Sequence, residues 1–198
     1  MKKNGLKKGI LVLVAIACLS LAFTGCYTPP PTTYSLRDIG PAGGWIFYDK
    51  GSYSDGWRYL EAAPSDQSTG WDTEWGCVGT AISGADGTAV GTGEQNTIDI
   101  EAGCTTPGTA ADICANLSLG GYSDWFLSSI DELVLMYENL KVYGVGGFAD
   151  YYWSSSEYAA EHPADYPADY AWRKDFPNGW QYGTLKSIPL WVRAVRAF

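Results

Sequence analysis

Hydrophobic residues gather in two aromatic-rich segments near residue 50, and polar residues separate them. The segments run from Gly43 to Asp49 and from Trp57 to Ala62, and the residues between them, 51 to 56, are mainly Gly, Ser and Asp. Aromatic-rich segments on either side of such a turn predict two strands joined as a hairpin. Residues 64 to 93 show little periodicity, and Gly, Ser, Thr and Asp dominate there. We predict a long ordered loop there.

Helical spacing of apolar residues marks the middle of the chain. Ser129 and Glu132 fit a capping box, in which each side chain bonds the backbone N–H of the other residue. An apolar stripe at helical spacing follows and predicts a core-facing side. It consists of Leu133, Met136, Tyr137 and Leu140. The elements predicted here are helices at about 93 to 102 and 109 to 117, a short strand at 123 to 127, and a helix from 129 to 140.

The last part of the chain returns to strand-like patterns. Strands are predicted at 151 to 156 and 170 to 172, a hairpin turn at 177 to 179, and a closing strand at 190 to 198. The segment 161 to 169 nearly repeats Pro-Ala-Asp-Tyr and is expected to be a surface excursion. Strands at both ends of the chain with helices between them predict an α+β fold with terminal hairpins, two to three helices and long ordered loops.

The first 25 residues have the three-part layout of an export signal. Four lysines precede an uncharged apolar run from Ile10 to Phe23, and Gly25 and Cys26 follow. The run is shorter than the roughly 20 residues of a membrane-spanning helix, which favours a cleaved signal peptide. The end of this segment resembles the lipobox of bacterial lipoproteins, although Phe23 stands where an aliphatic residue is usual. That resemblance implies lipidation at Cys26; cleavage before Cys18 and an uncleaved anchor are the alternatives.

The predicted organisation has three parts. Residues 1 to 25 form the signal peptide, residues 26 to 39 a Pro- and Thr-rich tether, and residues 40 to 198 the folded domain. Acyl chains at about 0.8 kcal/mol per buried methylene would hold the protein on a bilayer. Tyr27 follows the lipidated cysteine, and by analogy with lipoprotein sorting the lack of Asp there favours an outer membrane or cell-surface location.

The charge of the domain restricts its partners. All 22 Asp and Glu follow residue 25, whereas four of the 13 Lys and Arg precede it, so residues 26 to 198 carry nine positive and 22 negative side chains, a net charge of −13. An acidic domain does not attract nucleic acid, heparin-like chains or anionic lipid by bulk electrostatics.

Three cysteines remain after Cys26, in a compartment where disulfides persist. The turn at 105 to 108 could bring the following helix back beside Cys104, which favours a bridge between Cys104 and Cys114 and leaves Cys77 unpaired. Metal binding by the cysteines is not expected, because the chain has no Cys-x-x-Cys pair and a single histidine, His162.

Catalytic groups are sparse. His162 lies in the Pro-rich insert, away from any candidate nucleophile, and no enzymatic activity is expected. No cofactor is expected either; the weaker alternative is a calcium ion held by Asp165 and Asp169 with backbone oxygens.

Four motifs, in order, resemble the Lcl C-terminal domain family over about residues 40 to 198. They are Gly40-Pro41-Ala42-Gly43-Gly44 with Ile46-Phe47-Tyr48-Asp49, Leu119 to Leu127 with Glu132-Leu133, Trp153-Ser154-Ser155-Ser156-Glu157, and Val192-Arg193-Ala194-Val195-Arg196. The resemblance implies the C-type-lectin-like fold that this family shares with formylglycine-generating enzymes; Ser128 departs from the proline usual there. The activity of those enzymes is not expected, because their paired cysteines in the last strands are lacking.

The resemblance also implies roles for particular residues. Trp125, Trp153 and Arg196 are expected to maintain the fold, and Glu132 or Glu157 is expected to pair with Arg193 or Arg196. The family's founding member is an adhesin that recognises sulfated glycosaminoglycans. This acidic chain lacks the basic clusters that such a ligand needs, so the ligand does not transfer.

The nine Trp and 14 Tyr favour binding over catalysis, because aromatic faces beside hydroxyls and carboxylates suit neutral sugars or protein segments. Trp71, Trp75 and Trp180 are the candidates for ligand contact at the surface. The tryptophans expected to be buried are Trp45, Trp125, Trp153, Trp172 and Trp191. Two functions remain open: an envelope lipoprotein that recognises a glycan or protein, and a structural envelope lipoprotein with no small ligand.

Overall fold

The computed structural model describes residues 33–158 and 168–198, and residues 33 to 198 belong to one compact unit. Several predictions concern residues outside the described ranges. These are the signal peptide, lipidation at Cys26, the rival site at Cys18, His162 in the insert and the calcium ligand Asp165.

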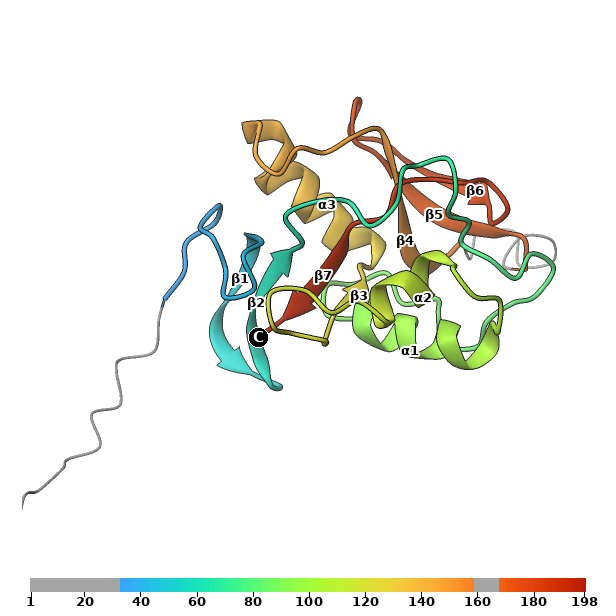
Figure 1. Cartoon of the computed structure of the whole chain (residues 1–198), viewed down its shortest axis with the longest axis horizontal. Coiled ribbons are helices and arrows are strands. Elements are labelled where there is room, and N and C mark those ends of the chain that lie inside the picture. Colours follow the sequence, from blue (N-terminus) through green and yellow to red (C-terminus); the bar gives the residue numbers. More distant parts are fainter. Residues whose placement is uncertain (1–32, 159–167) are drawn as a thin grey trace, which may run out of the picture. The chain divides into compact units, whose positions relative to one another are not determined.

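A four-stranded antiparallel sheet joins the start of the domain to its end. Its strands are β1 (Trp45–Ser54), β2 (Trp57–Ala62), β7 (Ala194–Ala197) and β3 (Phe126–Leu127), in the order β1-β2-β7-β3 (Figure 1). Tyr34, within the segment predicted as a tether, packs edge-on against the rings of Tyr59 and Phe198. The chain therefore joins the fold before β1 begins.

A three-stranded antiparallel sheet carries the second predicted hairpin. Its strands are β4 (Tyr151–Glu157), β5 (Tyr170–Asp175) and β6 (Gln181–Leu185), in that order. The predicted turn joins β5 to β6, and Gly179 adopts a φ of 77°, which glycine reaches without steric cost. Asp175 accepts a hydrogen bond from the backbone N–H of Asn178 and so fixes the turn.

Three α-helices and a short 3₁₀ helix complete the unit. They are α1 (Gly93–Gly103), α2 (Ala110–Ala115), α3 (Ile130–Asn139) and the 3₁₀ turn η1 (Lys141–Tyr143). The predicted capping box of α3 is confirmed, because Ser129 and Glu132 each bond the other's backbone N–H. α3 packs against β1, β4 and β5, whereas α1 and α2 pack against β3 and β4. The predicted α+β class is confirmed.

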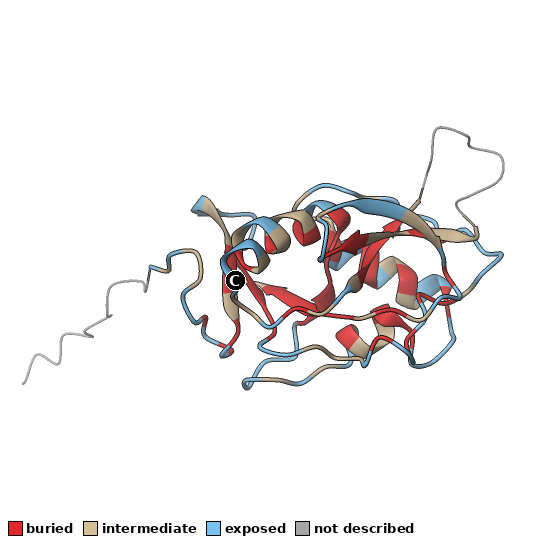
Figure 2. Ribbon diagram, turned by 90° about the horizontal axis from the view of Figure 1, so that it is seen from above, coloured by how far each residue is buried: buried red, intermediate tan, exposed pale blue. Residues whose placement is uncertain are grey.

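Two hydrophobic clusters form the core, and single strands contribute to both. β4 places Trp153 in one cluster and Tyr152 in the other, and β3 does the same with Leu127 and Phe126. Neighbouring residues of a strand point to opposite faces, so these strands can serve both clusters. Figure 2 shows the buried residues gathered between the helices and strands, with exposed residues mainly along the loops.

The tryptophans expected in the core divide into two groups. Trp125 and Trp153 are buried. Trp45, Trp172 and Trp191 are only half-buried, so the prediction was too strong for them. Trp45 begins β1, an edge strand, and Trp172 stacks edge-on against Tyr158.

The predicted ion pairs are wrong, although all four residues are buried. Arg196 pairs with Glu61 at 3.4 Å and with Asp124 at 2.8 Å. Arg193 pairs with Asp66 at 2.6 Å. The register of the sheet explains the first choice, because Arg196 lies directly opposite Glu61 in the β2–β7 pair. The remaining two acids, Glu132 and Glu157, have other partners.

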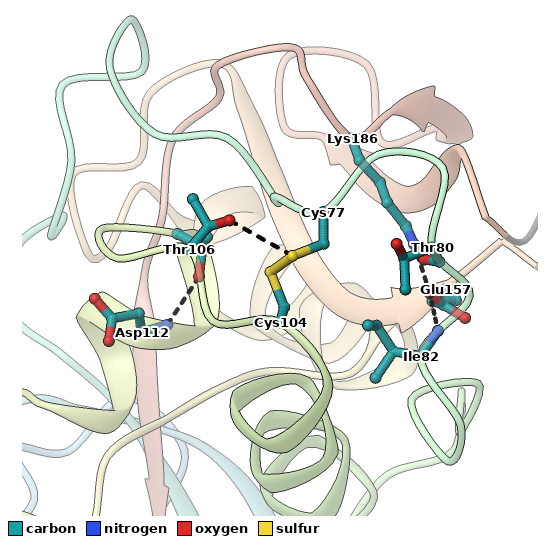
Figure 3. Close-up of a disulfide and its surroundings, with 9 residues drawn as sticks. Cys77, Thr80, Ile82, Cys104, Thr106, Asp112, Glu157 and Lys186 are labelled. Carbon is teal, nitrogen blue, oxygen red and sulfur yellow. Dashed lines mark hydrogen bonds and ion pairs between the residues drawn. A yellow bond between two sulfur atoms is a disulfide. The ribbon is translucent and has the colours of Figure 1, made fainter.

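The predicted Cys104–Cys114 bridge is also wrong. The disulfide joins Cys77 to Cys104 with a Cα–Cα distance of 5.7 Å (Figure 3). Cys114 is a buried free thiol. The backbone N–H of Trp75 bonds the carbonyl of Lys186, and the N–H of Ala110, at the start of α2, bonds the carbonyl of Glu74. These bonds hold the loop against the start of α2, so that Cys77 lies beside Cys104. Cys114 lies on the inward face of α2 and belongs to the core cluster.

Candidate functional site

Two of the candidate tryptophans lie four residues apart in the loop at 64 to 92 but have opposite environments. Trp71 is 83% exposed, whereas Trp75 is 1% exposed. The Trp75 indole donates a hydrogen bond to the carbonyl of Ser154 at 2.9 Å, and the ammonium of Lys186 lies 4.3 Å from its ring centre. Trp75 is therefore a core residue, and its prediction as a ligand contact is wrong.

A buried ion pair holds the same loop beside the disulfide (Figure 3). Lys186 bonds Glu157 at 2.5 Å and the carbonyl of Thr80 at 2.8 Å. Glu157 also accepts from the backbone N–H of Ile82. Burial raises the pKa of Glu157 and lowers that of Lys186, while the hydrogen bond between them opposes both shifts. Among the described residues, the side-chain hydrogen bonds of Lys186 and Glu157 go to the loop or to each other, so the role of the pair is structural.

An exposed aromatic surface lies on the sheet β4-β5-β6. Trp180 is 64% exposed and Tyr182 is 36% exposed, with their ring centres 6.0 Å apart. The guanidinium of Arg173 lies 5.3 Å from the ring centre of Tyr182 and 4.3 Å from that of Tyr151. We call Tyr151, Arg173, Trp180 and Tyr182 the hairpin ladder, since the side chains follow one another across three strands.

The hairpin ladder has the features of a recognition surface. Exposed aromatic faces can stack on a sugar ring or on an apolar side chain, and a guanidinium adds directional donors. The predicted candidate Trp180 thus lies beside Tyr182, whose ring is also approached by Arg173.

The structure does not bring Trp71 into this ladder. Gly70 lies against the indole of Trp191, whose backbone bonds β4 on the side away from β5. Trp180 precedes β6 at the opposite edge of the sheet. Among the described residues, no ring contact joins Trp71 to another aromatic side chain.

A separate pocket of about 300 Å³ lies between α1, α2 and the segment before β3. Glu94 and Glu101 line it from α1, and their spacing of seven residues is two helical turns, which puts them on one face. Ile98 lies between them and is 54% exposed. Trp125 and Phe126, both buried, provide apolar surface on the other side.

The acidic groups around this pocket differ in their partners. Asp124 pairs with Arg196, and this hydrogen bond lowers the pKa of Asp124. Burial, the neighbouring charge of Asp112 and a hydrogen bond between the two side chains raise the pKa of Glu101. Sequence reasoning missed the pocket. The spacing of Glu94 and Glu101 was a visible signal, but the opposite wall comes from a segment more than twenty residues further along the chain.

Comparisons with known proteins leave the family open, because no protein-family model and no curated protein sequence matches this chain. Within residues 33–158 and 168–198, no helix is long and apolar enough to cross a membrane. The same ranges contain no group of three or more His, Cys, Asp or Glu that could hold a metal ion. The predicted calcium pair is not tested by this, since Asp165 lies outside the described residues.

Proposed function

We propose that the protein is a bacterial cell-envelope lipoprotein whose folded unit recognises a glycan or protein ligand outside the cytoplasm. The hairpin ladder carries this proposal, because it exposes Trp180 and Tyr182 beside the cation of Arg173. Tryptophan, tyrosine and arginine are the residues most enriched at binding hot spots. Recognition by stacking also agrees with the −13 charge of the chain after residue 25, which leaves no large basic surface.

The proposed location rests on the amino-terminal signal and on the disulfide. Disulfides persist mainly in oxidising compartments, so the Cys77–Cys104 bridge supports export. Metabolic labelling with a fatty-acid analogue tests the anchor. The wild-type protein should be labelled and the Cys26→Ala variant should not; equal labelling of both proteins would refute lipidation at Cys26.

The finer fold assignment belongs to the same proposal. We propose a C-type-lectin-like fold related to the Lcl C-terminal domain family. Support comes from the sheet in which β2 near the start of the unit pairs with the closing strand β7, and from the buried positions of Trp125, Trp153 and Arg196. An experimental structure compared with solved C-type-lectin-like domains would test it, and a different strand order would refute it.

A glycan array is the first test of recognition. The full chain, purified in a non-ionic detergent, should retain one group of glycans or bind a cell-surface protein. Trp180→Ala should weaken that binding by about 30-fold, since truncating a hot-spot residue costs about 2 kcal/mol or more. Affinity should change little with ionic strength, because no large set of counterions is released.

Two further variants locate the ligand. Trp71→Ala tests the exposed tryptophan outside the ladder, and Tyr53→Ala, in the β1–β2 hairpin, is a matched control for loss of an exposed aromatic ring. Binding that is unchanged in Trp180→Ala but lost in Trp71→Ala would move the site to the loop. A protein with no ligand among glycans or surface proteins would support the alternative, a structural envelope lipoprotein.

A further inference from the structure

The carboxylate of Glu101 occupies a position that ordinary folding energetics disfavours. It lies in the last turn of α1, where the helix dipole is negative and where no basic residue is present. It is partly buried, and its side chain is hydrogen-bonded to another acid, Asp112, whose other partners are the backbone N–H of Gly108 and the side chain of Asn116. An acid that breaks local rules and has another acid, not a cation, as its side-chain partner marks a candidate functional position.

The rest of the pocket does not supply the missing cation. Within the described ranges, the side chain of Glu94 has no ion-pair partner, and none of the pocket-lining residues is Lys, Arg or His. Arg196 is close to the wall, but its guanidinium is already shared between Asp124 and Glu61. Two acidic side chains on one face of α1 therefore line the pocket, and neither has a cationic partner among the described residues.

The apolar wall and the volume of the pocket restrict which cationic ligand it could bind. The side chains of Ile98, Trp125 and Phe126 offer hydrocarbon and aromatic surface next to the two carboxylates. The volume of about 300 Å³ is at the lower end of the range for ligand pockets. A hydrated metal ion would not use the apolar surface, whereas an ammonium group on a short hydrocarbon stem would use both parts.

We infer that the pocket between α1 and α2 binds a primary ammonium group on a short hydrocarbon stem, with Glu94 and Glu101 as its counter-ions and Trp125 beside the stem. The site goes beyond the proposed recognition by the hairpin ladder and does not depend on it. In Figure 1, the turn between β5 and β6 lies well away from α1 and α2. Failure of one site would therefore leave the other standing.

Binding is measured by NMR on the full chain, ¹⁵N-labelled and purified in a non-ionic detergent. The reporter is the indole N–H of Trp125, which donates to the carbonyl of Leu119, and the indole of Trp180 serves as an internal control. Pentylamine should shift the Trp125 signal in a saturable way and leave that of Trp180 unchanged. Pentanol, which has the same stem without the charge, should bind at least about fivefold more weakly than pentylamine. Added salt should weaken the binding of pentylamine.

Charge variants test whether the amine binds at the pocket or is attracted only by the overall negative charge of the protein. Glu101→Gln and Glu94→Gln should each weaken the binding of pentylamine by about two- to fivefold, as expected for the loss of one partly exposed ion pair. Asp55→Asn, an exposed carboxylate in the β1–β2 hairpin, changes the net charge equally and should have no effect. Glu101→Gln should also unfold at a higher urea concentration, because it removes a disfavoured charge; this distinguishes a ligand contact from a residue needed for folding.

Two further arms complete the test. Ala115→Phe fills the pocket without altering charge and should abolish the shift. Nα-acetyl-lysine amide replaces pentylamine to ask whether the ammonium can come from a peptide side chain; a shift there supports that source, and none restricts the site to free amines. Equal binding of pentanol and pentylamine, or equal effects of Asp55→Asn and Glu101→Gln, would overturn the inference.

Discussion

The loop at 64 to 92 and the β5–β6 hairpin show opposite relations between backbone regularity and burial. The loop contains no helix or strand, yet it buries Thr73, Trp75 and Ile82. The hairpin has a regular antiparallel ladder, yet Trp180 and Tyr182 remain exposed. Regular hydrogen bonding is therefore a poor guide to which residues of this protein form its core.

The difference lies in where each backbone finds its partners. The loop satisfies its polar groups over long distances, with bonds from Trp75 to Lys186 and from Ala110 to Glu74. The hairpin satisfies most of its groups locally, between β5 and β6. A segment bonded to distant elements is drawn into the core with its side chains, because buried backbone groups need partners. A locally bonded segment can stand at the surface.

The sharpest test compares the two loop tryptophans. Trp75→Ala should lower the free energy of unfolding by about 3–5 kcal/mol, because it leaves a large cavity and an unpaired carbonyl at Ser154. Trp71→Ala should change it by no more than about 0.5 kcal/mol. Urea unfolding followed by circular dichroism measures both. Similar losses in the two variants would contradict the burial of Trp75.

The disulfide should contribute the next largest effect to the loop. Cys77 and Cys104 are separated by 27 residues, and closing such a loop in the unfolded chain is worth about 3–4 kcal/mol in the chain-entropy model. Cys77→Ala/Cys104→Ala should lose about that much stability. Peptide mapping under non-reducing conditions should link the Cys77 and Cys104 peptides and leave Cys114 alkylatable only after unfolding. A bridged Cys114 peptide would contradict this pairing.

The carboxyl group of Glu132 fastens the end of the loop to α3 and should make that contact sensitive to pH. It accepts from the backbone N–H groups of Gly91 and Ser129. Burial raises its pKa from 4.5 to about 7, although these hydrogen bonds oppose the shift. The folded state therefore favours the protonated form. The stability that this group contributes is greatest below pH 4.5 and is lost as the pH rises towards 7.

Deprotonation of Glu132 should lower the free energy of unfolding by at most about 3 kcal/mol, since one pKa unit corresponds to about 1.4 kcal/mol. The measurement is urea unfolding from pH 4 to 8 for the wild type and Glu132→Gln. The wild type should lose stability relative to the variant as the pH rises. Glu138→Gln, which makes the same change at an exposed carboxylate of α3, is the control. A constant difference between the wild type and Glu132→Gln would exclude titration of Glu132 in this range.

The smallest effect is expected in the hairpin. Trp180→Ala removes an exposed ring that contacts the ring of Tyr182, so the free energy of unfolding should change by about 0.5 kcal/mol or less. Urea unfolding of this variant beside Trp75→Ala completes the comparison. A loss above about 2 kcal/mol would mean that the hairpin ladder supports the core.

Features that depend on neighbouring residues were predicted correctly from the sequence. The capping box of Ser129 and Glu132 spans three residues, and the turn ending at Gly179 requires a residue that tolerates positive φ. Both are decided by local geometry. The exposure of Trp180 follows from the same turn, because a residue beside a hairpin tip stands at the edge of the sheet.

Features that depend on distant residues were not predictable in the same way. The Trp75 indole bonds Ser154, 79 positions away, and Arg196 pairs with Glu61, 135 positions away. Any of several acids could have faced Arg196, and only the register of β2 and β7 selected one. The pocket has the same origin, since its two walls come from α1 and from the segment before β3.

The amino-acid sequence by itself determined the order of helices and strands, the caps and turns that delimit them, and the acidic charge of the domain, because these arise from residues close together or from composition alone. Only the tertiary structure decided which cysteine pairs with Cys104, which loop tryptophan is buried, and which carboxylates remain without a cation. Those outcomes depend on how strands from both ends of the chain align. Burial of hydrophobic surface stabilises many alternative pairings by similar amounts. Shape complementarity and hydrogen bonds between distant segments select one of them.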